Sequence, residues 1–421
     1  MAVDADGDIF VVGQYSAPDL DLGGGALGGG GATGVFVAKF SGNNGSHVWS
    51  RSLSATGFAN GSDIEVDAEG DVIVTGFFGG TIDFGGGAVT STDPLRDFYV
   101  VELSGADGSH LWSTTFSGAP AMGVGLGRLV RVAAGSEGVF VLGSFASTVQ
   151  LGGATVTTAG ESDVFLLKLA GGDGSHVWSR TFGGATTDAG VDVAVDSAGD
   201  VLLCGFFTSP TFSLGGPVYG ASMLADIFLA KLSGVDGSHV WSKAIGGSGN
   251  DRATALALGS EDRVVVAGTF QSAVDFGSGS VLVNSGGSGD IFVVSYDSAG
   301  NLLMDRSIDG SFGVEEALGL AVARDGDVVL TGAFPELIDF GAGPLTTAGE
   351  KDAFVARFTE AGALVGAVQV GSPQDDQALS VAVAGDGRPV VAGFGGGTTT
   401  VGLPVAGVGF EDLLVAKLPL E

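Results

Sequence analysis

The sequence predicts an all-β protein, and three observations lead to this prediction. Glycine accounts for 77 of the 421 residues, while the apolar fraction of 45% is ordinary for a folded chain. The glycine content therefore indicates neither disorder nor collagen. The apolar residues fall in runs of four to eight, bounded by Gly, Asp and Ser, as in short β-strands. The same series of runs recurs along the whole chain, which is typical of repeat architectures.

The repeat is clearest around one turn. Val66–Phe78 reads VDAEGDVIVTGFF, and Val195–Phe207 reads VDSAGDVLLCGFF. The residue at the turn recurs every 61 to 68 positions, at Gly7, Gly70, Gly138, Gly199, Asp262, Gly326 and Gly387. Seven such copies use the whole chain and leave no linker, so we predict a single domain. The approximate bounds of the copies are 1–60, 61–125, 126–189, 190–252, 253–316, 317–377 and 378–421.

Each copy carries the same elements in the same order. A short alternating strand such as Asp192–Asp196 leads through a glycine turn to a second strand, for example Asp200–Phe207. A loop with a glycine hairpin follows, as in Ile82–Gly87. The third strand begins with Asp, as in Asp226–Lys231, and another turn opens a fourth strand such as Ser175–Phe182. No stretch has the periodicity of an amphipathic helix.

The second and third strands are apolar at successive positions, which predicts that both of their faces are covered. Four strands per unit with both faces buried is the requirement of a blade that packs between two neighbours. We therefore predict a seven-bladed β-propeller with about four antiparallel strands per blade. The last copy stops at Leu418 after its third strand, so we expect the last blade to lack its outer strand.

A glycine recurs within the second strand of every copy. A strand glycine is weakly placed unless another backbone or ring approaches closely. Phe or Tyr follows two residues later in six copies, which we interpret as an aromatic ring of one element lying over the glycine of its neighbour. The glycines are Gly13, Gly76, Gly143, Gly205, Gly268, Gly332 and Gly393, and the aromatic residues are Tyr15, Phe78, Phe145, Phe207, Phe270 and Phe334.

Charge and composition exclude several classes of protein. Asp and Glu number 48 against 17 Lys and Arg, a formal charge of −31, so phosphate backbones and anionic lipid are repelled and nucleic acid is a poor partner. No run reaches the roughly 18 apolar residues of a membrane helix, so we expect no membrane insertion. The single cysteine, Cys204, excludes a disulfide scaffold and is expected to be a small buried residue. We expect a monomer.

Five motifs together resemble a known family. They are the strand with Gly-Asp, an apolar run and Gly-Phe, the hairpin Asp83–Gly87, the Asp-x-Phe strand Asp226–Lys231, the strand Gly237–Ser242 (GSHVWS) and the Gly-Gly after it. The chain resembles the bacterial seven-bladed β-propeller repeat of surface and secreted proteins, especially those of myxobacteria. The resemblance implies an extracellular or cell-surface location and no particular reaction. No secretion signal precedes Met1, so we expect one to have been trimmed.

All four histidines and all four tryptophans lie in one repeated motif, with Trp two positions after His. A repeated sugar site or a metal site would be the functional interpretation. Equivalent histidines of adjacent blades would be roughly 15–20 Å apart, too far to share an ion. Copies five and six replace the pair with Leu302 and Met304, and with Leu364 and Gly366, which favours packing. The pairs are His47 and Trp49, His110 and Trp112, His176 and Trp178, and His239 and Trp241.

Acidic residues recur in the loop between one copy's last strand and the next copy's first. They are Asp188, Asp251, Glu315 and Asp376, and in a propeller they share a face with the hairpin residues Asp21, Asp83, Asp275 and Asp339. This acidic loop face predicts a site for Ca²⁺, a cationic ligand or a glycan. The alternative is that each Asp caps its own turn. No cofactor is predicted other than Ca²⁺.

No catalytic constellation emerges from the motifs. The turn Asp4–Asp8 is similar to part of a calcium loop but lacks the glycine and closing glutamate of an EF-hand, and hairpin chemistry accounts for it. Every histidine belongs to the repeated strand motif, which leaves none for a Ser–His–Asp triad. We therefore expect a non-enzymatic binding or scaffold module whose partner is a protein, glycan or cation on the acidic loop face. The alternative is a propeller enzyme of the glycoside hydrolase or lyase type with carboxylates at its central mouth.

Overall fold

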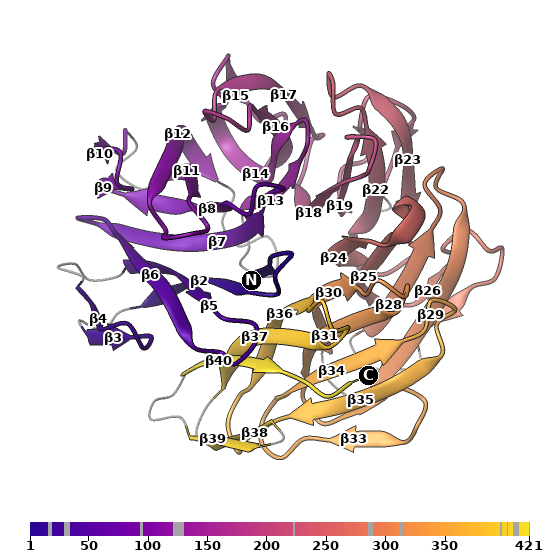
Figure 1. The fold of residues 1–421 in the computed structure, drawn as a ribbon. Helices are drawn as coiled ribbons and strands as arrows, with labels where there is room; N and C mark the ends of the chain where they lie inside the picture. Colours follow the sequence, from indigo (N-terminus) through magenta and orange to yellow (C-terminus); the bar gives the residue numbers. More distant parts are fainter. Residues whose placement is uncertain are drawn as a thin grey trace. The chain divides into compact units, whose positions relative to one another are not determined.

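The computed structural model describes residues 1–15, 19–28, 34–92, 96–120, 130–221, 224–284, 289–310, 315–395, 398–401, 403–406 and 412–420 (Figure 1). The chain divides into two compact units. Residues 1–203, 207–220 and 230–240 form the first, and residues 204–206, 221–229 and 241–421 form the second. Within the described ranges the helical content is one 3-10 turn, η1 (Ser260–Asp262), and no helix there could span a membrane.

Antiparallel sheets of one kind follow each other through the first unit. In each, the strands are hydrogen-bonded in the order first, second, third and fourth along the chain. Sheet 1 contains β1 (Ala2–Val3), β2 (Ile9–Tyr15), β5 (Gly34–Phe40) and β6 (His47–Ser54). Sheet 2 contains β7 (Phe58–Val66), β8 (Val72–Gly79), β11 (Asp97–Leu103) and β12 (His110–Pro120). Sheet 3 contains β13 (Val130–Gly135), β14 (Gly138–Gln150), β16 (Asp163–Leu169) and β17 (His176–Phe182).

The same order continues in the rest of the chain. Sheet 4, to which both units contribute residues, contains β18 (Asp188–Val195), β19 (Val201–Phe207), β22 (Asp226–Leu232) and β23 (His239–Ile245). Sheet 5 contains β24 (Arg252–Leu258), β25 (Val264–Phe270), β28 (Asp290–Tyr296) and β29 (Leu302–Gly310). Sheet 6 contains β30 (Glu316–Val322), β31 (Val328–Phe334), β34 (Asp352–Phe358) and β35 (Leu364–Val370). Sheet 7 contains β36 (Gln377–Val383), β37 (Pro389–Gly395) and β40 (Asp412–Lys417).

The loop between the second and third strands of a sheet forms a small hairpin of its own. These hairpins are β3 (Asp19–Asp21) with β4 (Ala26–Gly28), β9 (Thr81–Asp83) with β10 (Ala88–Thr90), β20 (Phe212–Ser213) with β21 (Val218–Tyr219), β26 (Ala273–Val274) with β27 (Leu282–Val283), β32 (Leu337–Asp339) with β33 (Pro344–Thr346), and β38 (Thr398–Val401) with β39 (Leu403–Ala406). In sheet 3, β15 (Thr155–Thr157) pairs with the extended end of β14. Backbone pairs also join neighbouring sheets, since β12 continues onto β14 and β29 onto β32.

Burial follows the prediction for strands covered on both faces. Every described side chain of β8, β11, β16, β19, β31 and β34 is buried. The apolar cores lie between successive sheets: one core contains Phe10 and Trp49 of sheet 1 together with Tyr99 of sheet 2. Within each unit, first strands also pack on one another, with β13 contacting β7 and β18, and β30 contacting β24 and β36.

This arrangement confirms the predicted fold class, an all-β β-propeller architecture of repeated antiparallel blades. Sheet 7 has three strands in the described residues, as expected for a last blade without its outer strand. The number of blades in a closed propeller, and the assignment of the whole chain to one domain, stay predictions.

The turn between first and second strands is the point where the backbone needs unusual freedom. All seven predicted turn residues have a positive φ, between 56° and 130°. Six of them are glycine, which adopts this conformation without steric penalty. In sheet 5 the position holds Asp262, and Glu261 before it also has a positive φ, so the turn becomes η1. Asp tolerates a positive φ better than most residues.

The structure confirms that an aromatic ring lies over strand glycines such as Gly13 and Gly332, but the ring is not the one that follows two residues after the glycine. A Cβ on Gly13 would lie 2.5 Å from the ring of Phe36, and one on Gly332 would lie 2.8 Å from the ring of Phe354. Phe36 and Phe354 stand directly opposite these glycines, so the ring belongs to the third position of the third strand. It does not belong to the aromatic residue two positions after the glycine, such as Tyr15.

Candidate functional site

The four predicted ligand residues of the acidic loop face are all buried. Asp188 is 0% exposed. Its Oδ2 atom accepts hydrogen bonds from Gly184 N and Ser209 Oγ, both at 2.7 Å, and its Oδ1 accepts one from Thr208 N at 3.2 Å. These bonds tie the start of β18 to the loop after β19. A ligand would have to displace them to reach the carboxylate.

Asp251 and Asp376 have the same kind of environment. Asp251 Oδ2 accepts a hydrogen bond from Gly247 N at 2.8 Å, and its Oδ1 accepts one from Gln271 N at 2.9 Å. Asp376 Oδ2 accepts one from Ser372 N at 2.6 Å. Each carboxylate therefore caps the turn that precedes it, as an Asp does readily. That they bind a ligand stays a prediction.

Two of these acids have an acidic neighbour on the third strand of the preceding sheet. Burial raises the pKa of Asp226 to about 6, and the charge of Asp251 raises it further in the same direction. Burial likewise raises the pKa of Glu315 to about 7, with Asp290 as a second contribution. The Asp of the Asp-x-Phe motif is visible in the sequence, but only its position in the sheet brings it beside the loop acid. Gly246 makes room, since a Cβ there would lie 2.1 Å from Asp226 Oδ1.

Replacing Glu315 with Gln is expected to stabilise the protein at pH 8 and not at pH 4. The pKa of Glu315 is above its unfolded value, so its unfavourable burial is absent below about 4.5 and fully present above about 7. Stability is thus lost as the pH rises through this window. The neutral isostere removes that loss, about 3 kcal/mol by the size of the shift. Urea unfolding at pH 4, 6 and 8 measures it.

Glu336→Gln is the matched control, because Glu336 is exposed on the same unit. We expect its unfolding midpoint to follow that of the wild type at every pH. If Glu315→Gln and wild type show the same pH dependence, Glu315 is not the group that titrates.

The first strands carry a mixed charged group that the sequence analysis missed. Arg131 of β13 lies 3.4 Å from Asp63 Oδ1 of β7 and 3.7 Å from Asp192 Oδ1 of β18. Glu65 is near them, and burial followed by the charge of Asp63 raises its pKa to about 8. Polar and apolar residues alternate along β7, which marks the positions of Asp63 and Glu65 in the sequence. The strands that carry Arg131 and Asp192 belong to other copies, so the sequence alone does not bring these residues together.

The predicted hairpin acids also have structural partners. Asp21 Oδ1 accepts hydrogen bonds from Gly23 N and Gly25 N, and Asp83, Asp275 and Asp339 repeat this pattern with the glycines that follow them. The carboxylate holds the tight Asp-x-Gly turn in place.

The histidines pack on these glycine hairpins. A Cβ on Gly24 would lie 2.2 Å from His47 Cε1, and a Cβ on Gly86 would lie 2.4 Å from His110 Cε1. His47 and His110 also pair with Ser50 Oγ and Ser113 Oγ at 3.0 Å. The ring thus covers a surface that only glycine can offer, which favours the packing interpretation of the motif.

Each tryptophan links its sheet to the next one within a unit. Trp49 Nε1 donates to Gly105 O at 3.0 Å, and the ring lies over Gly108 of sheet 2. Trp112, Trp178 and Trp241 make the same bond to Gly171, Gly234 and Ser298. One face of each indole lies against a glycine in the turn of the next sheet, so sugar stacking on that face would require displacement of this contact. In sheet 6, where Gly366 replaces Trp, a Cβ on Gly366 would lie 3.2 Å from Leu420 Cδ2.

A cationic side chain of the third strand neutralises the Asp turn in several sheets. Lys39 Nζ lies 3.2 Å from Asp4 Oδ2 and 3.2 Å from Asp8 Oδ2. Lys231 occupies the same place between Asp196 and Asp200, and Arg357 between Asp325 and Asp327. Because one cation serves two partly buried carboxylates, the turn is well compensated.

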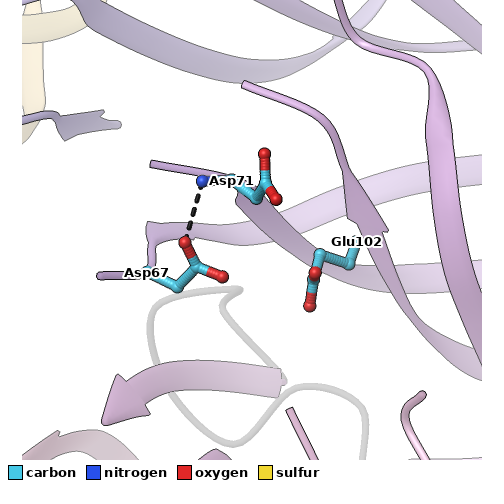
Figure 2. A group of neighbouring side chains, drawn as sticks. All are labelled: Asp67, Asp71 and Glu102. Atoms are coloured by element: carbon cyan, nitrogen blue, oxygen red, sulfur yellow. Dashed lines mark hydrogen bonds between the residues drawn. The ribbon is translucent and has the colours of Figure 1, made fainter. Parts of the chain in front are cut away.

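Sheet 2 departs from this arrangement (Figure 2). Its Asp turn contains Asp67 and Asp71, but the third-strand position holds Glu102. One oxygen of each of the three carboxylates lies within 4.8 Å of the others. Glu102 is 7% exposed, and its Oε2 atom is buried without a hydrogen-bond partner. Aligning Lys39, Glu102, Lys168, Lys231, Ser295, Arg357 and Lys417 would have revealed this reversal of charge.

A cavity among the described residues of the second unit is small and apolar. Its lining includes Ala353, Val391 and Leu414, with no carboxylate. It lies where sheets 6 and 7 pack, and it offers no room for catalysis by the buried acids described above.

Comparisons with known proteins give a weak relationship. No family model matches the chain. The regulatory protein FlaEY of Caulobacter vibrioides is 27% identical over 261 residues, which cover 58% of this chain and 26% of that protein. The aligned part thus spans about a quarter of that relative's length.

Solved structures of β-propellers share the general architecture. BamB from Moraxella catarrhalis is 13% identical with a TM-score of 0.36, covering 85% of this chain and 87% of that one. The Dos1 propeller is 8% identical with a TM-score of 0.41, covering 93% and 88%. A quinohemoprotein alcohol dehydrogenase from Comamonas testosteroni is 11% identical with a TM-score of 0.40, covering 92% and 65%. Such scores carry no argument about activity.

Proposed function

We propose that the chain is a non-enzymatic binding or scaffold module, displayed on the surface of a bacterium or secreted, that contacts a protein partner through its fourth strands. One feature supports this proposal. The pairing of third and fourth strands shifts register at the same place in five sheets, leaving a bulge. In each of these sheets, the fourth-strand residue that has no partner at the bulge is aliphatic and exposed.

These bulge residues are Val48, Leu111, Val177, Leu303 and Val365, and Val240 has the same place in the sheet 4 motif. Between 41% and 56% of each side chain is exposed. Single exposed apolar residues are normal on protein surfaces. Here the exposed aliphatic residue instead recurs at one register position of the fourth strand, and this recurrence is the feature on which the proposal rests.

The remaining chemistry favours binding over catalysis. The histidines cover glycine hairpins, and Asp188, Asp251 and Asp376 cap turns. The formal charge of −31 favours a partner with a basic surface, since opposite charges steer encounter. The surface or secreted location rests on the resemblance of the repeat motifs to the bacterial family.

The test is the triple variant Val48→Ser/Leu111→Ser/Val177→Ser, all within the first unit. Immobilised protein is exposed to the secreted and envelope fractions of the source bacterium, and any retained partner is purified for affinity measurement. We expect the triple variant to bind that partner at least tenfold more weakly. A control variant carries Val218→Ser and Val235→Ser, which are exposed outside the bulges, and should bind like wild type.

Two results would contradict the proposal. Equal affinity of the triple variant and wild type would exclude the bulge residues as the contact surface. Turnover of a glycan or ester in a broad substrate panel would favour the alternative, a hydrolase or lyase that uses its carboxylates.

A further inference from the structure

The carboxylates of Asp67 and Asp71 each use one oxygen to build their turn. Asp67 Oδ1 accepts hydrogen bonds from Glu69 N at 3.0 Å and Asp71 N at 2.8 Å, the second of which is drawn in Figure 2. Asp71 Oδ1 accepts one from Gly105 N at 2.9 Å. The Oδ2 atom of each residue is left for another interaction.

The same Oδ2 atoms bind an ammonium group in sheet 1. Lys39 Nζ contacts Asp4 Oδ2 and Asp8 Oδ2, and it donates a third hydrogen bond to Gly105 O at 3.3 Å. These contacts satisfy all three donors of the ammonium group. In sheet 4, Lys231 contacts Asp196 Oδ2 and Asp200 Oδ2. The turn is thus built to hold a cation.

Glu102 occupies the lysine position of sheet 2 in the same register. Lys39 stands opposite Trp49 on the fourth strand, and Glu102 stands opposite Trp112. The carbonyl that corresponds to Gly105 O is Gly171 O, as both accept the hydrogen bond of the tryptophan of the preceding sheet. Sheet 2 therefore keeps the acceptors of the pocket and replaces its cation with a third carboxylate.

Three carboxylates this close repel one another strongly when partly buried. Burial, with the charges of Asp67 and Asp71, raises the pKa of Glu102 to about 7. The Oε2 atom of Glu102 is buried without a hydrogen-bond partner, whereas a buried carboxylate oxygen normally has a donor or a metal ion as partner.

We propose that Asp67, Asp71 and Glu102 bind Ca²⁺, which takes the place that the lysine ammonium has in the neighbouring sheet. Ca²⁺ binds carboxylate and carbonyl oxygens at about 2.3–2.6 Å, so two of its ligands lie up to roughly 5 Å apart. The 4.8 Å limit on the separation of the three oxygens fits this range. Without His or Cys in the group, the ligand set favours a hard cation over Zn²⁺. Gly171 O would complete one side of the site.

The experiment uses the whole chain and Tb³⁺ as a luminescent probe for Ca²⁺. Trp112 stands opposite Glu102 in the sheet, so excitation of tryptophan is expected to sensitise Tb³⁺ bound there. Added Ca²⁺ should displace Tb³⁺, with a dissociation constant of about 10⁻⁴–10⁻³ M as in extracellular calcium modules. Salt at about 0.15 M suppresses diffuse binding to the acidic surface.

Glu102→Lys is the decisive variant because it restores the residue that sheets 1 and 4 already accommodate. We expect it to fold, to lose most of the sensitised emission, and to lose the rise in melting temperature that Ca²⁺ gives wild type. Glu69→Gln, an exposed change in the same turn, should leave binding unchanged. The converse variant Lys231→Glu should gain one bound ion, since it places a third carboxylate beside Asp196 and Asp200.

Equal emission and equal Ca²⁺ stoichiometry in wild type and Glu102→Lys would overturn the proposal. A second pair of results would also overturn the proposal. These are a wild type that binds no ion at millimolar Ca²⁺, and a Glu102→Gln variant that has a higher melting temperature than wild type at pH 8. In that case the pocket would hold a proton on Glu102 rather than a metal ion.

Discussion

Gly332→Ala is expected to destabilise the protein by more than about 3 kcal/mol, because a methyl group does not fit between two strands. Its Cβ would lie 1.8 Å from Glu316 O and 2.8 Å from the ring of Phe354. The first contact is with backbone, so relief requires β30 and β31 to separate. The Phe354 ring is itself fully buried and cannot move away. Urea unfolding followed by circular dichroism measures the loss.

Gly385→Ala is the control for this prediction. Nothing lies within 4 Å of a Cβ on Gly385, and its backbone does not adopt a positive φ. We expect a change within about 0.5 kcal/mol. Comparable effects at Gly332 and Gly385 would show that loss of glycine flexibility, rather than steric overlap, determines the cost.

The second large effect is expected for Arg357→Met, at about 2–3 kcal/mol of lost stability, because it removes a buried donor from four acceptors while solvent screens one of them, the exposed carboxylate of Asp325. The guanidinium group donates to Asp325 Oδ2, Asp327 Oδ2, Gly387 O and Leu420 O, and the residue is 4% exposed. Methionine fills a similar volume but leaves two carboxylates and two carbonyl groups without this donor.

Arg388→Met provides the comparison for Arg357. Arg388 contacts Asp386 on the surface, where solvent screens the pair. Its unfolding midpoint should stay close to that of the wild type. If Arg357→Met behaved in the same way, the buried network would contribute little to stability.

Much of the fold could be predicted from local sequence, because each strand and turn has a short-range cause. The runs around Val72–Gly79 are apolar on both faces, and the glycine at position 70 has the positive φ that its turn requires. The pairing of elements was harder to predict. The ring over Gly332 comes from the opposite strand rather than from Phe334, since cross-strand register decides which side chains meet.

The candidate sites were harder still to predict. The sequence points to Asp188 and Asp251 by their charge, but charge alone does not distinguish an exposed ligand from a buried cap. Glu102 does not stand out in the sequence, because a single Glu within an apolar strand is common. Its importance comes from Asp67 and Asp71, which are more than thirty positions away in the sequence, and from what Lys39 does in the equivalent position.

The reversal of charge at Glu102 has a consequence for how such a chain evolves. Codons for lysine and glutamate differ by one nucleotide, so one point mutation in one duplicated copy can turn an internal ion pair into a pocket for a dissolved ion. The other copies keep their own ion pairs, so the fold is retained after the mutation. Repetition therefore gives mutational tolerance, because one copy can acquire a new binding site while the contacts in the other copies still stabilise the fold.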